Sequence, residues 1–156
     1  MPTFFIGLAV LVGPYPLLDK PEDDTTMLTK DEIAVVEETN KERKAAKLPA
    51  FKVSVALLTM AREHSATQAR LMKMDHDLDG KTFEDRLKAS KYPFRRAGEN
   101  VAAGQETPKD VLVSWMNSPG HKANILNDEF EEIGVAVEVA NDGTRYWTQV
   151  FGAKRK

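Results

Sequence analysis

The alternation of apolar and polar residues predicts two long helices near the start of the chain. Residues 29–47 combine a charged outer side with an apolar inner side, and Thr29 with Glu32 matches a capping box. Residues 55–72 repeat apolar or small side chains at helical spacing. Leu48-Pro49 lies between them and predicts a break, because the residue before a proline is disfavoured in a helix.

Two shorter helical segments follow. Residues 82–89 begin with a threonine that is a suitable N-cap. Thr107-Pro108 predicts another helix start, because proline fits the first helical turn, and Ser118-Pro119-Gly120 predicts its end. Residues 121–126 are expected to form one further helical turn, which places His121 just past the helix end.

The last part of the chain has the pattern of β-strands. Residues 133–140 alternate and are rich in valine, residues 145–151 are rich in aromatic and β-branched side chains, and Asn141-Asp142-Gly143 is a turn signal. These segments predict an antiparallel hairpin, whereas residues 91–97 are expected to be irregular. Because helices lead and strands close the chain, the order predicts an α+β fold rather than alternating βαβ units.

Residues 1–27 differ from the rest of the chain. Phe4–Val12 is an apolar run with the length of a signal-peptide core, and it is too short to span a bilayer. No lysine or arginine precedes it and no Ala-x-Ala site follows, so a degraded or mis-started signal peptide is favoured over an apolar arm packed on the domain. An acidic linker, residues 19–26, then leads to a single folded domain at residues 28–156.

Composition narrows the class of protein. The 156 residues are 42% hydrophobic and 29% charged, with a net charge of −2, as in a soluble globular domain. No basic face stands out, so a nucleic-acid partner is not expected, and Lys154-Arg155-Lys156 is interpreted as a solvated tail. The chain has no cysteine, which excludes disulfides, thiolate nucleophiles and cysteine zinc sites.

Asp75 to Gly80 resembles the first half of an EF-hand loop, with oxygen ligands at alternate positions before a glycine. The resemblance then fails, because the twelfth position is Arg86 where a bidentate glutamate is required, and the eighth is Thr82. A polar loop of Asx turns is therefore favoured over a calcium site.

His76, Glu99 and His121 are the candidate functional residues. Two imidazoles and a carboxylate suit Zn²⁺ or another divalent cation, and the same groups could perform acid–base chemistry. Their spacing is not that of a metal motif, so the alternative is that Glu99 braces the backbone and the histidines line a groove passively. His64 lies beside the apolar face of its helix and is interpreted as a packed or partly exposed helix residue rather than a ligand.

Four motifs follow one another in the chain: Gly98 to Ala102, Trp115 to Leu126, Glu132 to Val137 and Tyr146 to Gly152. Together they resemble the bacterial branch of the CAP superfamily, which comprises the cysteine-rich secretory proteins, antigen 5 and plant pathogenesis-related proteins. The module of this superfamily is also called the SCP domain. The resemblance covers about Leu28 to Lys156. It implies a three-layer α–β–α sandwich with a small antiparallel sheet and a large open cleft, in a secreted or cell-envelope protein without a membrane span in its mature form.

The resemblance also implies a cleft tetrad of His, Glu, Glu and His. The matching positions are His76, Glu99 and His121, and in some family members the two histidines bind zinc or another divalent ion. The second glutamate should follow the helix tryptophan by three positions, where this chain has Ser118. Serine cannot act as a carboxylate base, so the departure weakens a four-residue acid–base site more than a two-histidine metal site.

These observations favour an exported ligand-binding or interaction module with a divalent-metal site at His76 and His121. The cleft ligand is undefined, with a sterol, a fatty acid or a peptide as the candidates that the resemblance implies. The alternative is a metal-assisted, peptidase-like hydrolase that acts on envelope or extracellular material. The missing second carboxylate favours binding over catalysis.

Overall fold

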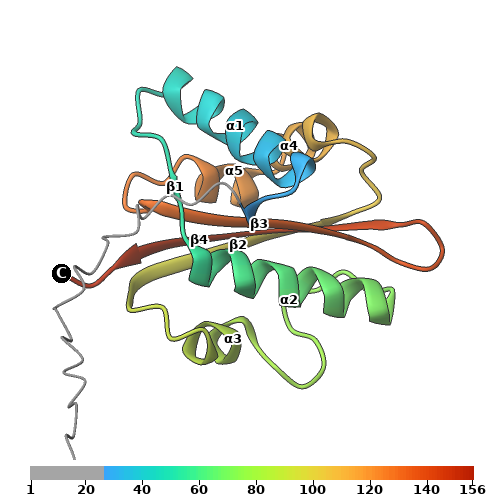
Figure 1. Cartoon of the computed structure of the whole chain (residues 1–156). Helices are drawn as coiled ribbons and strands as arrows, with labels where there is room; N and C mark the ends of the chain where they lie inside the picture. The colour runs from blue at the N-terminus through green and yellow to red at the C-terminus, as the bar shows by residue number, and fades with distance from the viewer. Residues whose placement is uncertain (1–26) are drawn as a thin grey trace, which may run out of the picture.

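The computed structural model describes residues 27–156, which form a four-stranded sheet between two helical layers (Figure 1). The helices, in chain order, are α1 (Lys30–Ala45), α2 (Val55–Leu71), α3 (Phe83–Ala89), α4 (Pro108–Met116) and α5 (Pro119–Ile125). Helices α1, α4 and α5 cover one face of the sheet, and α2 and α3 cover the other. The predicted α+β sandwich is therefore confirmed.

The sheet has the strand order β1-β3-β4-β2. The strands are β1 (Lys52–Val53), β2 (Phe94–Ala103), β3 (Glu132–Val139) and β4 (Arg145–Lys154). Strand β4 pairs antiparallel with both β2 and β3, while the two-residue β1 adds a parallel edge to the start of β3. Strand β2 is thus the terminal strand on the other side, where groups from both helical layers can reach its edge.

Threonine caps begin three of the helices, as the sequence predicted. Thr29 forms the predicted capping box with Glu32 at the start of α1, and Thr82 forms a second with Asp85 at the start of α3. Thr107 caps α4, with proline in its first turn. Each cap satisfies backbone N–H groups that a helix cannot bond internally, which fixes where the helix begins.

A large apolar core fills the layer between the sheet and α1, α4 and α5, and a smaller one lies under α2 and α3. Trp115 and Trp147 are fully buried in the first. The second depends on close contact between α2 and β3 at Gly134, where an added Cβ would lie 2.1 Å from the Leu57 carbonyl carbon. Only glycine allows the helix backbone to lie this close to the strand.

Three local features differ from the sequence expectation. Phe94 to Ala103 forms one ten-residue strand, although residues 91–97 were expected to be irregular. The short edge strand β1 was not predicted. Helix α5 begins at Pro119 rather than at His121, with Ser118 as its N-cap, so the segment that was expected to end one helix begins the next.

No helix within residues 27–156 is long and apolar enough to cross a membrane. The predicted signal-like run and acidic linker fall within residues 1–26 and lie outside the described residues.

Candidate functional site

Strand β2 places two polar residues on opposite sides of the sheet, because successive side chains of a strand alternate. Glu99 faces α2 and α3, and its side chain is only 2% exposed. Its neighbour Asn100 faces α5 and is fully buried. The strand therefore brings a buried carboxylate to one side of its edge and a buried amide to the other.

The Glu99 carboxylate is held by two side chains. Arg86 of α3 donates from Nη1 to Oε2 at 2.7 Å and from Nη2 to Oε1 at 2.9 Å, which is a bidentate ion pair. His76 Nδ1 lies 2.9 Å from Oε1. Both Glu99 oxygens thus have partners. Because Nδ1 of His76 bonds to Glu99, Nε2 is the ring nitrogen on the side away from the carboxylate.

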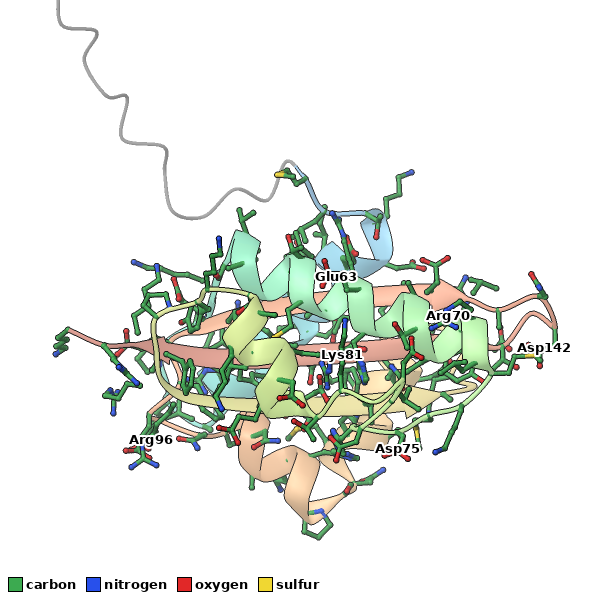
Figure 2. The ribbon with its side chains drawn as sticks, turned by 90° about the horizontal axis from the view of Figure 1, so that it is seen from below. Glu63, Arg70, Asp75, Lys81, Arg96 and Asp142 are labelled. Carbon is green, nitrogen blue, oxygen red and sulfur yellow. The ribbon has the colours of Figure 1, made fainter. Side chains whose placement is uncertain are left out.

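His76 lies in the loop between α2 and α3, which Asp75 marks in the view of Figure 2. Two of the loop's aspartates accept hydrogen bonds from backbone N–H groups: Asp75 Oδ1 accepts from Asp77 N at 3.3 Å, and Asp77 Oδ1 accepts from Phe83 N at 3.1 Å. Asp79 and Gly80 both have positive φ, at 56° and 72°, in a tight turn. Asx turns and this turn explain the EF-hand-like pattern.

His64 of α2 is buried behind the same carboxylate. Its Nε2 lies 2.9 Å from the Asp75 carbonyl oxygen and 3.8 Å from Glu99 Oε1. The sequence interpretation left a packed or a partly exposed position open for His64. The structure shows the packed one, with a contact to the His76 loop that the interpretation missed. The spacing of His64 from Asp75 could not show that the loop folds back over the helix.

His121 lies in the first turn of α5, on the other side of the β2 edge. Its carbonyl oxygen accepts from Asn100 Nδ2 at 3.1 Å, and Asn124 Nδ2 donates to Asn100 Oδ1 at 2.9 Å. Asn124 Nδ2 also lies 3.3 Å from the Glu99 carbonyl oxygen. The asparagines therefore tie α5 to β2 and hold the His121 backbone next to the strand segment that carries Glu99.

The His121 ring itself is less constrained than its backbone. Its Nδ1 is buried and has no hydrogen-bond partner among residues 27–156. No hydrogen bond within the described chain joins this ring to Glu99 or His76. An orphaned buried nitrogen is unusual, because it has lost its bonds to water without gaining others.

The three histidines have different pKa directions. The hydrogen bond to Glu99 raises the pKa of His76 above its usual value. Burial lowers the pKa of His64, and burial together with the charge of His76 lowers that of His121. Burial alone would raise the pKa of Glu99, but hydrogen bonds from His76 and Arg86 outweigh it, so that pKa is lowered. The charge of His76 is thus felt at His121, across the strand edge.

The structure brings His76 and Glu99 into direct contact and places His121 nearby. Sequence reasoning missed Arg86, which it considered only as an unsuitable calcium ligand. No group of three or more histidine, cysteine or acidic side chains within residues 27–156 is arranged to hold a metal ion. Ser118, at the position of the expected second glutamate, begins α5 and supplies no carboxylate.

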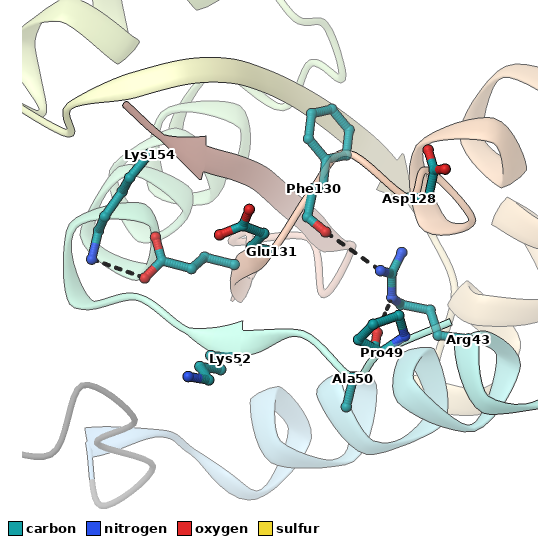
Figure 3. Close-up of a pocket in the computed structure, with 9 residues that line it drawn as sticks. Arg43, Pro49, Ala50, Lys52, Asp128, Phe130, Glu131 and Lys154 are labelled. Carbon is teal, nitrogen blue, oxygen red and sulfur yellow. Dashed lines mark hydrogen bonds and ion pairs between the residues drawn. The ribbon is translucent and has the colours of Figure 1, made fainter. Parts of the chain in front are cut away.

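A hollow of about 320 Å³ lies elsewhere, between the end of α1, β1 and the segment that leads into β3 (Figure 3). Arg43 and Glu132 are its buried charged groups, and the Arg43 guanidinium donates to the carbonyl oxygens of Pro49, Ile125 and Asn127 at 2.8–2.9 Å. These bonds hold the neighbouring segments together. The guanidinium therefore has a structural role, and the hollow is a less convincing ligand site than the histidines.

Comparison with known proteins gives a consistent assignment of fold. The family described as "CAP: Cysteine-rich secretory protein family" matches residues 36–151 of this chain. The uncharacterized protein YkwD of Bacillus subtilis (strain 168) is 38% identical over 122 residues, which cover 77% of this chain and 46% of that protein. The chain thus spans less than half the length of this relative.

Solved structures agree with this result. An outer surface protein from Borrelia burgdorferi superposes with a TM-score of 0.75 at 27% identity, over 83% of this chain and 97% of that chain. An extracellular protein containing an SCP domain from Bacillus anthracis str. Ames superposes with a TM-score of 0.72 at 31% identity, over 80% of this chain and 40% of that chain.

Proposed function

The chain belongs to the CAP (cysteine-rich secretory protein) family, and from that membership we propose that it is an exported module that binds a ligand at His76 and His121. A divalent cation such as Zn²⁺ helps to anchor the ligand at these two residues. Export is supported by the similar Bacillus anthracis protein, which is described as extracellular, and by the signal-like run Phe4–Val12.

The observation that carries the proposal is the state of the Glu99 carboxylate. It is buried, paired with Arg86 and bonded to His76 Nδ1. A carboxylate that bonds one ring nitrogen of a histidine orients the other nitrogen toward a ligand, and this arrangement recurs behind metal-binding histidines. Glu99 therefore serves to present His76 rather than to react.

The residues present fit a weakly held cation. His76 offers Nε2, and His121 has a buried Nδ1 without a partner in the described part of the chain. Two imidazole nitrogens suit Zn²⁺, whose remaining positions would be left to water or to an oxygen ligand. Such a cation would supply a positive charge that attracts an anionic or carbonyl group of the bound molecule.

Binding is favoured over hydrolysis because the site lacks a free carboxylate base. Both oxygens of Glu99 are occupied, its pKa is lowered, and Ser118 stands where a second carboxylate would be needed. A general base must accept a proton at working pH with an accessible oxygen. The chemical class of the ligand remains a prediction, with sterol, fatty acid and peptide as its candidates.

The test is calorimetric titration of the purified protein with Zn²⁺ at pH 7.5. We expect one binding event that weakens about tenfold or more in His76→Ala and in His121→Ala, because loss of a metal ligand should cost at least as much as loss of a group that supports one. Asp142→Asn, in the turn between β3 and β4, is the control and should bind as wild type. Equal Zn²⁺ affinity in wild type and both histidine variants would exclude the proposed site.

Ligand class is tested separately by incubation with sterol, fatty-acid and peptide probes, with and without Zn²⁺. We expect retention of one probe class that depends on His121. Hydrolysis of a peptide probe that is lost in Glu99→Gln would contradict the binding proposal and favour the enzyme alternative.

A further inference from the structure

The loop that carries His76 is attached to the domain at two consecutive carbonyl groups. His64 Nε2 of α2 lies 2.9 Å from the Asp75 carbonyl oxygen. Arg86 Nη2 of α3 donates to the His76 carbonyl oxygen at 2.8 Å. The backbone on either side of the His76 Cα is therefore fixed from two different helices.

The same two side chains surround Glu99. Arg86 binds both of its carboxylate oxygens, and His64 Nε2 lies 3.8 Å from Oε1. His76 bonds to that same Oε1 through Nδ1. The His76 backbone and ring are thus both held by groups that converge on one buried carboxylate.

The geometry of Arg86 is specific to a guanidinium. Its planar fork spans the two Glu99 oxygens while Nη2 also reaches the His76 carbonyl oxygen. A lysine ammonium carries the same charge as a point and cannot reproduce a bidentate contact. The side chain of Arg86 is also largely buried, at 11% exposure, so these bonds compete little with water.

We propose that Arg86, together with His64, is a positioning residue that fixes the orientation of His76 by clamping its loop to Glu99. This inference rests on the proposed function in one respect: ligand binding gives the orientation of His76 a purpose. The clamp itself is a property of the protein without ligand. Arg86 does not touch the ligand.

A second arginine that contacts the same loop provides a matched comparison. Arg70 Nη2 lies 2.7 Å from Asp79 Oδ2, but both side chains are more than half exposed. Figure 2 shows Arg70 near the end of α2 and Asp75 in the loop that follows this helix. An exposed pair of this kind contributes little to order, so its loss should leave His76 in place.

The test compares Arg86→Lys with Arg70→Lys by NMR at a pH above the titration midpoint of His76, which the same ring resonances determine. In wild type, His76 should carry its proton on Nδ1, donated to Glu99. In Arg86→Lys we expect mixed tautomers and amide exchange in residues 73–81 that is about tenfold faster, equivalent to the loss of one net hydrogen bond. Arg70→Lys should match wild type in the His76 tautomer.

Because lysine keeps the charge, a role limited to neutralising Glu99 would leave both readouts at wild-type values in Arg86→Lys, and that result would overturn the proposal. If Arg86→Lys does not fold, the double variant Glu99→Gln/Arg86→Gln removes both buried charges together. If Arg86 clamps the loop, the amides of residues 73–81 should exchange faster in this double variant as well. Amide exchange as slow as in wild type would contradict the proposal.

Zn²⁺ affinity is measured on the same samples and should fall about tenfold in Arg86→Lys, as mutation of a group supporting a metal ligand commonly produces. Absence of Zn²⁺ binding in wild type would defeat the proposed function. It would not affect the tautomer and exchange results, which need no metal, so the two proposals fail independently.

Discussion

At the scale of single residues, Glu99 controls the charge of His76. In Glu99→Gln the hydrogen-bonding shape remains but the negative charge is lost, so the pKa of His76 should fall from its raised value toward or below the ordinary value of about 6.5. The ring resonances of His76, followed by NMR from pH 5 to pH 9, measure this. Glu84→Gln, which breaks an exposed pair with Lys88, should leave the midpoint unchanged.

The same substitution should destabilise the fold. Removing one partner of a buried ion pair costs about 3 kcal/mol, because Arg86 keeps its charge without a counterion. The lowered pKa of Glu99 means that its contribution is present above its unfolded value of about 4.3 and is lost as pH falls through the folded value. Wild-type stability in Glu99→Gln at pH 7 would show that the pair is unimportant.

The sequence could single out His76, Glu99 and His121 as candidates because two of them lie in motifs with a recognisable order of residues and the third is a histidine in a polar loop. It could not identify Arg86 or His64 as their neighbours. Arginine in a short amphipathic helix is ordinarily solvated, and only the tertiary placement of α3 against β2 turns this one toward Glu99. Contacts between segments distant in sequence leave no local pattern.

At the scale of secondary-structure elements, Gly134 sets how α2 lies on β3. Gly134→Ala would place a methyl group 2.1 Å from the Leu57 backbone, which cannot move without displacing the helix. We expect a loss of about 3 kcal/mol in unfolding free energy by urea titration, at the upper end of overpacking costs. An unchanged midpoint would mean that α2 and β3 are farther apart than described.

Gly120→Ala is the matched control for this change. Gly120 lies in α5, has no positive φ, and an added Cβ there would meet no atom within 4 Å. Alanine is the better helix former by about 1 kcal/mol, so this variant should be equal to or more stable than wild type. The pair separates steric conflict from the general effect of losing a glycine.

The elements that sequence predicted well are those whose ends carry local signals. Thr29, Thr82 and Thr107 cap their helices as expected because capping depends on a few adjacent residues. Strand β2 was not predicted, because four of its ten residues are alanine or glycine, which have low strand preference. Its conformation depends on pairing with β4, for example between Gly98 and Phe151, and such pairing decides over local preference.

At the scale of the whole molecule, arginine side chains link segments that a protein without cysteine cannot join by disulfides. Arg43 of α1 binds the carbonyl oxygens of Ile125 and Asn127, more than 80 residues away. Arg62 of α2 binds the buried Glu32 of α1 through two contacts of 3.0 and 2.6 Å. Arg43 thus ties α1 to the end of α5, Arg62 ties α2 to α1, and Arg86 ties α3 to strand β2.

The histidines make the stability of this assembly depend on pH. His64 is buried with a lowered pKa, so as pH falls below about 6.5 the unfolded chain takes up a proton that the folded chain does not, and stability decreases. His121 acts in the same direction, and His76, whose pKa is raised, acts in the opposite one. One net proton corresponds to a slope of at most about 1.4 kcal/mol per pH unit.

Urea unfolding at pH 7.0, 6.0, 5.5 and 5.0, a range above most carboxylate titrations, measures this slope. We expect wild type to lose stability over the range and His64→Gln to lose much less, because the amide can still donate to the Asp75 carbonyl oxygen but cannot titrate. Equal slopes in the two proteins would place the pH dependence outside His64. A steeper slope in His76→Gln is the complementary expectation, since that substitution removes the histidine that favours the folded state at low pH.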